Sequence, residues 1–243
     1  MTQSDDLLSQ HNIDLIIFDC DGVLIDSETL SKRVLLNMLA KLGINLSDDY
    51  YYAHFLGYNF EHVTAKVLAD FSVTLTNEFR HNYRQALIEV FAVELEPTID
   101  LKWLLGQLKV NSCVATSSSP EKVKHTLNYT SLTDYFNGRV YTSSQVKHGK
   151  PAPDLFLHAA AKMGVAPKNC LVIEDSQAGV QAAQAANMRV IRYAGASHMK
   201  NRDIASQFTD GVNTIEHWQQ LVEQAPSIIA EQLGNNSSDK NKR

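Results

Sequence analysis

The sequence is poor in cysteine, and its few cysteines lie far apart. Cys20, Cys113 and Cys170 are the only three in 243 residues. Their odd number and the absence of a CxxC spacing argue against a disulfide framework and against a zinc site built from thiolates. We expect those within apolar runs to act as small hydrophobic side chains.

The chain also lacks an excess of positive charge and any long apolar run. It carries 22 Lys and Arg against 27 Asp and Glu, with both signs interspersed, so no basic face predicts a nucleic-acid or anionic-membrane partner. No apolar run reaches the ~18 residues of a membrane span. The start, MTQSDDLLSQHN, has neither the basic residues nor the apolar centre of a signal peptide. We therefore expect a cytoplasmic protein whose partner is a small molecule, with no protein partner implied.

The apolar residues, 44% of the chain, fall into runs that predict a sheet covered by helices. The runs typical of buried strands are residues 13–18, 112–119, 138–144, 170–176 and 188–194. Helical spacing separates the later runs at 120–128, 153–163 and 177–186. This alternation predicts an α/β fold with a doubly wound, Rossmann-like parallel sheet.

Between the first two predicted strands, the apolar spacing is helical. Residues 30, 34, 35, 38, 39 and 42 form one such stripe, and Gly43 would close that helix. We interpret residues 28–96 as a small inserted helical cap domain, and residues 1–27 with 97–233 as the core domain. Residues 234–243 have the composition of a disordered tail. The alternative is that the helical block belongs to one continuous helical layer.

Polar side chains follow four of the predicted strands, where open α/β sheets bind their ligands. The residues concerned are Asp19 and Asp21 after the first strand, Thr116 to Ser119 at the end of the second, Lys150 after the third, and Glu174 and Asp175 at the end of the fourth. Side chains two apart in a strand share a face, so Asp19 and Asp21 should point the same way. Two carboxylates this close to each other repel. Both therefore persist only if one of them keeps its proton or if a cation lies between them.

Each of these elements also has a purely structural explanation. Asp21 and Gly22 form a common turn pair, and serines before Pro120 are typical helix caps. Lys150 fits a solvated loop, and Glu174 with Asp175 fits a cap of the next helix. Polar residues at four successive strand ends are nevertheless hard to explain as a coincidence. Their positions favour one functional site at this edge of the sheet.

Four segments carry a resemblance to a known family. FDCDGVLIDSE, VATSSSP, HGKPAPD and VIEDSQAG, in that order, resemble the four motifs of the haloacid dehalogenase superfamily. The match covers about residues 13 to 195. The helical block after the first motif is similar to the cap of the subgroup that contains β-phosphoglucomutase and many small sugar phosphatases.

The resemblance implies a role for each motif residue. Asp19 would be the nucleophile that forms an aspartyl-phosphate, and Asp21 the general acid and base. Lys150 would bridge Asp19 and the phosphate, while Ser117 and Ser118 would help to bind the phosphoryl oxygens.

The resemblance also implies a cofactor and a lid. Mg²⁺ would be held by Asp19, the backbone carbonyl of Asp21, Asp175 and Glu174. The cap would close about hinges near Ser27 and Pro97. Its segment FLGYNFEH offers Gly57, Tyr58 and Asn59 as contacts to a sugar or polyol.

These roles predict a Mg²⁺-dependent phosphatase for a small sugar or sugar-acid phosphate, 6-phosphogluconate among them. A phosphomutase of the β-phosphoglucomutase type is the second hypothesis. The resemblance to such a mutase would predict a His and an Arg at the positions that Ser31 and Phe60 occupy in this chain. Dehalogenases lack the second Asp and the Gly, so Asp21 and Gly22 disfavour that chemistry. A third hypothesis is a non-catalytic regulatory protein with the same fold. The presence of Asp19, Asp21 and Lys150 argues against it.

Overall fold

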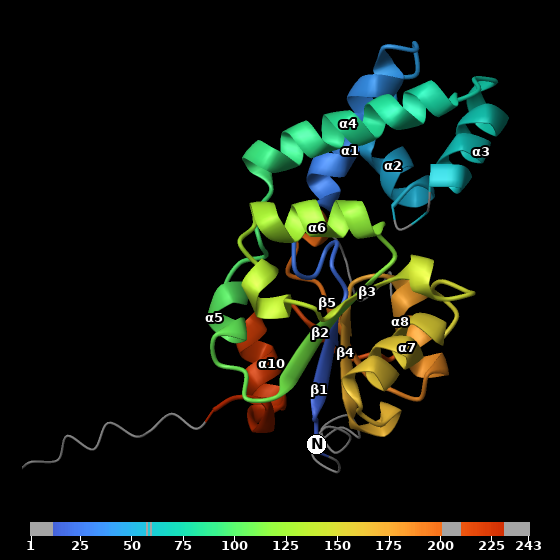
Figure 1. The fold of residues 1–243 in the computed structure, drawn as a ribbon. Coiled ribbons are helices and arrows are strands. Elements are labelled where there is room, and N and C mark those ends of the chain that lie inside the picture. The colour runs from blue at the N-terminus through green and yellow to red at the C-terminus, as the bar shows by residue number, and fades with distance from the viewer. Residues whose placement is uncertain (1–11, 57, 59, 201–209, 231–243) are drawn as a thin grey trace, which may run out of the picture.

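The computed structural model describes residues 12–56, 58, 60–200 and 210–230 (Figure 1). Most of the N-terminal segment before the first strand, the predicted tail at 234–243 and two predicted cap contacts, Gly57 and Asn59, lie outside the described residues. Across the described ranges, no helix has both the length and the apolar character that crossing a bilayer requires.

The described residues form a parallel sheet with β1 in its interior. Its strands are β1 (Leu15–Phe18), β2 (Asn111–Thr116), β3 (Val140–Thr142), β4 (Cys170–Glu174), β5 (Arg189–Tyr193) and β6 (Thr214–Ile215). The order across the sheet is β3-β2-β1-β4-β5-β6. Phe18, the last residue of β1, lies opposite Val114 of β2 and Ile173 of β4. The strand order reverses direction at β1, which is where such sheets bind ligands.

Helices cover both faces of this sheet, as the alternating pattern predicts. The helices of this part of the chain are α5 (Leu101–Leu105), α6 (Pro120–Tyr129), α7 (Asp154–Met163), α8 (Gln177–Ala185) and α10 (Trp218–Gln224). Leu15 and Ile17 pack among side chains of α7 and α8, whereas Ile16 and Phe18 pack among those of α5, α6 and α10. Each buried aliphatic or Phe side chain contributes about 1.5–3 kcal/mol.

Four helices lie between β1 and α5, apart from these two layers (Figure 1). They are α1 (Glu28–Ala40), α2 (Asp48–His54), α3 (Phe60–Phe71) and α4 (Asn77–Glu94), and we call them the helical insertion. They enclose an apolar cluster of their own, which includes Leu39, Tyr51 and Val67. The helices of the insertion thus have an apolar cluster apart from those of the sheet. Phe91, near the end of α4, packs instead with the core of the sheet.

The two segments that join the helical insertion to the sheet run side by side. Ile25 forms an antiparallel bridge with Pro97, and the Thr98 hydroxyl donates to the Val23 carbonyl at 2.7 Å. Asp26, at the end of the loop after β1, accepts hydrogen bonds from the backbone and side chain of Ser197. The predicted hinge positions thus lie beside this paired connection.

The strand boundaries differ from the prediction where serines follow a strand. β2 ends at Thr116 and not at residue 119, because Ser119 is the N-cap of α6 and Pro120 its first residue. The Ser119 hydroxyl accepts from the Lys122 backbone at 3.3 Å. The short elements α2 and β6, and the helix α10, were not among the predicted elements.

Candidate active site

The predicted site residues meet because β1, β2 and β4 are neighbours. The carboxyl ends of these strands carry Asp19, Thr116 and Glu174 respectively, and parallel strands end at the same edge of the sheet. Lys150 follows β3, yet its side chain is only 5% exposed and reaches this edge. The solvated-loop explanation of Lys150 is therefore wrong.

Asp19 and Lys150 form the closest ion pair of the site. The Lys150 ammonium donates to Asp19 at 2.5 Å and to Glu174 at 2.6 Å. Burial raises the pKa of Asp19 well above its usual range, and Glu174 and Asp175 raise it further, although Lys150 works in the opposite direction. The single positive charge of Lys150 does not balance the negative charges of the Asp19, Glu174 and Asp175 carboxylates.

Asp21 has partners of its own. Its carboxylate accepts hydrogen bonds from Ser27 at 2.7 Å, from Ser118 at 2.6 Å and from the Lys122 ammonium at 2.8 Å. Burial acts to raise the pKa of Asp21, but the charge of Lys122 and these hydrogen bonds outweigh it, so the pKa is lowered. The two acids are not alternate residues of one strand, since β1 ends at Phe18. Each acid instead has a lysine of its own.

Two glycines permit the close packing of the acids. A Cβ on Gly22 would lie 2.0 Å from a carboxylate oxygen of Asp175, and the φ of +79° also favours glycine. A Cβ on Gly179 of α8 would lie 1.8 Å from a Glu174 oxygen. Both approaches are shorter than any real Cβ contact, so larger residues here would displace the acids.

The serines after β2 have three different positions. Ser118 contacts Asp21, and Ser119 caps α6, as the structural explanation of this stretch predicts. The Ser117 side chain is exposed, and its recorded hydrogen bond is made by its carbonyl, which accepts from Ser143. Thr116 is buried, and its hydroxyl accepts from the Ser118 backbone at 3.0 Å. The structure therefore brings Ser118, rather than Ser117, into contact with a motif acid.

Two further titratable side chains lie close to the acids. Burial and the charge of Asp21 raise the pKa of Glu28, the first residue of α1, to about 7. His198, which follows β5, lies 3.4 Å from a carboxylate oxygen of Asp175. Neither was a predicted site residue, although Glu28 is the last residue of the first motif, FDCDGVLIDSE.

Lys122 is the principal functional candidate that the sequence analysis missed. It lies in the first turn of α6, where a cation is unfavourable beside the positive end of the helix dipole. That unfavourable placement is the signal that could have identified it. Its partner Asp21 is 101 residues away in sequence, so no local pattern reveals the pair.

Tyr58 is the one predicted cap contact that the structure describes. Its side chain is 56% exposed, and its ring stacks on His62 at 4.0 Å between centroids. It is therefore available for a ligand, but it contacts none of the motif acids.

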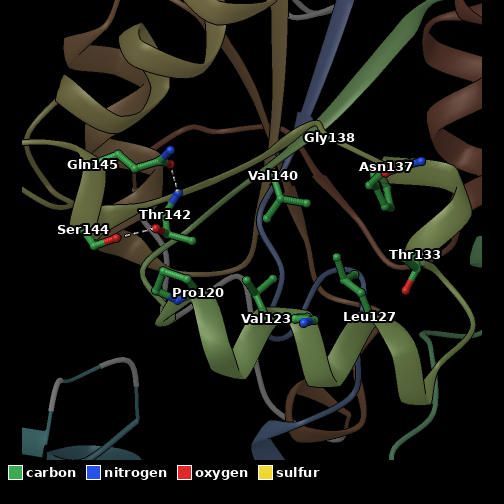
Figure 2. Close-up of a pocket in the computed structure, with 12 residues that line it drawn as sticks. Pro120, Val123, Leu127, Thr133, Asn137, Gly138, Val140, Thr142, Ser144 and Gln145 are labelled. Carbon is green, nitrogen blue, oxygen red and sulfur yellow. Dashed lines mark hydrogen bonds between the residues drawn. The ribbon is translucent and has the colours of Figure 1, made fainter.

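The apolar pocket in Figure 2 lies away from this chemistry. It has a volume of about 340 Å³ and is formed by α6, β3 and the short helices on either side of β3. Val123 and Leu127 of α6 point toward Val140 of β3 there. The pocket lining contains none of the motif acids, so the site follows from the polar groups rather than from this hollow.

Comparison with known proteins agrees with the geometry. A model of the haloacid dehalogenase-like hydrolase family matches residues 13–187, and a second HAD-hydrolase-like model matches residues 147–233. The chain belongs to the haloacid dehalogenase-like hydrolase family. The predicted family is thus confirmed, and the chain is a hydrolase.

Several members of this hydrolase family are similar over most of the chain. The 6-phosphogluconate phosphatase of Escherichia coli is 31% identical over 87% of this chain and 94% of its own length. The fructose-1-phosphate phosphatase of the same organism is 31% identical over 72% of this chain and 94% of its own length. A haloacid dehalogenase-like protein of unknown function from Agrobacterium tumefaciens superimposes with a TM-score of 0.78 at 32% identity, covering 87% of this chain and 97% of that one.

The acidic rim of this hydrolase fits a divalent cation. Burial and then the charge of Glu174 raise the pKa of Asp175, and burial raises that of Asp19, so a cation beside these two carboxyl groups would stabilise their charged forms. Among the described residues, no three His, Cys, Asp or Glu side chains converge enough to hold an ion by themselves. Mg²⁺ commonly takes one or two carboxylates and keeps several waters, so Asp19, Asp175 and the Asp21 carbonyl are a suitable donor set.

Glu174 fits a supporting position in that set. One of its oxygens accepts from Lys150, and the other accepts from the Ser176 backbone and hydroxyl at 2.8 and 2.9 Å. With both oxygens engaged, Glu174 is better placed to act through a water molecule than as a direct ligand.

Proposed function

We propose that the chain is a Mg²⁺-dependent phosphatase that hydrolyses a small sugar or sugar-acid phosphate through an aspartyl-phosphate on Asp19. Its class is that of the phosphoric monoester hydrolases. The observation that carries the proposal is the Asp19–Lys150 pair at the carboxyl end of the interior strand β1, with Asp21 in the following turn. The similarity to the 6-phosphogluconate and fructose-1-phosphate phosphatases supports a small phosphorylated substrate.

In the first half-reaction, an Asp19 carboxylate oxygen bonds to phosphorus as the ester P–O bond breaks. Lys150 lies where its charge offsets the repulsion between Asp19 and the phosphate. The alkoxide that leaves takes a proton from Asp21, which has to be in its protonated form for this step although Lys122 lowers its pKa. Ser118, through its hydroxyl, holds the Asp21 carboxylate in place for this transfer.

In the second half-reaction, water attacks phosphorus and Asp21 takes the water proton. The Asp19 carboxylate is released together with inorganic phosphate, so the enzyme returns to its starting state. The lowered pKa of Asp21 favours the carboxylate form, which is the form that this step needs.

Mg²⁺, when bound, supplies positive charge that reduces repulsion between the carboxylates and the phosphate. Asp19, Asp175 and the Asp21 carbonyl would hold it. Mg²⁺ should therefore raise the Tm of metal-free protein, and should raise that of Asp175→Asn much less. Equal rises in the two proteins would argue against this binding site.

The helical insertion would cover the substrate and exclude water during both steps. Its paired connection to the sheet passes directly beside Asp21, through the segment that contains Ile25 and Ser27. Movement of the insertion would thus be transmitted close to the acid and base.

The test is phosphate release from a panel of phosphorylated metabolites with Mg²⁺ or with EDTA, for wild type and Asp19→Asn. We expect release that requires Mg²⁺ and falls at least about a thousandfold in Asp19→Asn. Equal activity in both proteins, or none in either, would reject the phosphatase. Conversion of glucose 1-phosphate without phosphate release would instead favour the phosphomutase.

The structure shows what occupies the positions that matter for that alternative. Ser31 is buried in α1, and the Phe60 ring lies 5.6 Å from the Tyr83 ring. Neither side chain offers a cation for a second phosphate, and for this reason we place the hydrolase first.

A further inference from the structure

Lys122 lies where the helical insertion meets the sheet domain. Its ammonium donates to Asp21 at 2.8 Å and lies 5.9 Å from the centre of the Phe91 ring of α4. Figure 1 shows α6, which carries Lys122, between the insertion and the sheet. A group leaving from Asp19 past Asp21 would enter this junction.

The position of Lys122 does not serve the stability of α6. A cation in the first turn is disfavoured by the helix dipole, whereas Glu121 in the same turn is favoured. The Lys122 side chain nonetheless turns toward Asp21 and keeps 33% of its surface exposed. About a third of this side chain is therefore open to solvent beside the pair with Asp21.

Lys122 and Asp21 differ in how fully they are hydrogen bonded. Asp21 accepts from three side chains, whereas Asp21 is the one hydrogen-bonding partner recorded for the Lys122 ammonium among the described residues. An ammonium has three N–H donors. Lys122 thus keeps donor capacity for an acceptor that the described protein residues do not provide.

The charges around Lys122 limit what that acceptor can be. Glu28 and Asp21 act on Lys122 as negative neighbours, and both would repel a second phosphate. A single carboxylate carries less charge, and one ammonium is a suitable partner for it.

We propose that Lys122 is a specificity-determining residue that binds a carboxylate on the leaving part of the substrate. This inference rests on the proposed phosphatase function and narrows it, from sugar phosphates in general to phosphate esters of hydroxy acids and sugar acids. Lys122 is already paired with Asp21, but its remaining N–H donors can make a charge-assisted hydrogen bond to a carboxylate, and this bond is stronger than one to the neutral hydroxyl of an analogue.

The experiment compares substrates that differ only in the carboxylate. One pair is 6-phosphogluconate and glucitol 6-phosphate, and a shorter pair is phosphoglycolate and 2-hydroxyethyl phosphate. We expect wild type to prefer the acid of at least one pair by about tenfold or more in kcat/KM. Lys122→Met should reduce that preference to near unity, mainly by raising KM for the acid, and Lys122→Arg should retain it.

Lys124→Met is the matched control, because Lys124 is an exposed residue of the same helix and its loss changes the net charge equally. It should leave the preference unchanged. Lys122→Gln provides a second variant if Lys122→Met unfolds, with Tm as the check on folding.

Two results would overturn the inference. The first is that the wild-type protein shows no preference for the acid in either pair of substrates. The other is an equal loss for both members of a pair in Lys122→Met, which would make Lys122 a positioning residue for Asp21. Both differ from failure of the proposed function, in which no member of either pair, and no other phosphorylated metabolite, releases phosphate.

Discussion

The sheet domain and the helical insertion are built in different ways. Every residue of β1 and β4 is buried, and the polar groups at their ends are held by short, shielded ion pairs such as Lys150–Asp19. The insertion has one smaller apolar cluster, and its Arg33–Glu94 pair is about half exposed on both sides. The ion pairs of the sheet domain are therefore better shielded from solvent than the Arg33–Glu94 pair of the insertion.

The largest effect that would test this contrast is the loss of an acid from each region. Asp21→Asn should lower kcat on an alkyl phosphate by about 10²–10⁴-fold, because the alkoxide then lacks its proton donor. Asp48→Asn, which removes an acid that pairs with Lys32 within the insertion, should change kcat less than about twofold. Steady-state phosphate release measures both, and equal losses would remove the distinction between the regions.

A smaller effect distinguishes two glycines with nearly the same φ angle. Gly22 in the sheet domain has φ of +79° and Gly43 after α1 has φ of +80°, but an added Cβ meets Asp175 at Gly22 and nothing within 4 Å at Gly43. Gly43→Ala should cost about 1 kcal/mol of unfolding free energy from the backbone alone. Gly22→Ala should cost about 1–3 kcal/mol more, because it adds a steric clash. Urea unfolding of metal-free protein measures both, and equal costs would show that Asp175 is not closely packed there.

The smallest effect is a dependence of stability on pH that belongs to Glu28. Its pKa is 4.5 ordinarily and about 7 in the folded protein, so the folded state binds this proton more tightly than the unfolded chain. Ionisation therefore costs stability, which falls as pH rises from the lower value to the higher one and then levels off. The full shift corresponds to at most about 3 kcal/mol.

Glu28→Gln should remove this loss in metal-free protein. Wild type and variant should have parallel stabilities above pH 7, with the variant relatively more stable there than at pH 4.5. Urea unfolding at several pH values provides the measurement. A constant difference between wild type and Glu28→Gln would contradict the raised pKa.

Much of the sheet domain could be predicted because its signals are local. Strands of a parallel sheet are buried on both faces, so they occur as continuous apolar runs such as LIIF and CLVIE. The neighbouring ends of β1, β2 and β4 then bring Asp19, Ser118 and Glu174 to one rim. Chain order and strand-end position were sufficient to predict that meeting.

What the sequence did not reveal depends on contacts between distant residues. The Lys122–Asp21 pair forms because α6 folds back over the carboxyl end of the sheet, and His198 reaches Asp175 through the loop after β5. The serines after β2 were included in the strand because their role as a cap depends on where α6 begins. The strand β6 is two residues long, which is too short for any periodic pattern.

The central claim is that Asp19 becomes covalently phosphorylated. Asp21→Asn with p-nitrophenyl phosphate tests it most directly, because this leaving group needs no proton donor while hydrolysis of the intermediate still needs the base. We predict a burst of nitrophenol that approaches one equivalent of enzyme, with the phosphoryl group on the peptide that contains Asp19 in acid-quenched samples. Nitrophenol and phosphate released in step from the first turnover, with that peptide unmodified or another one phosphorylated, would contradict it.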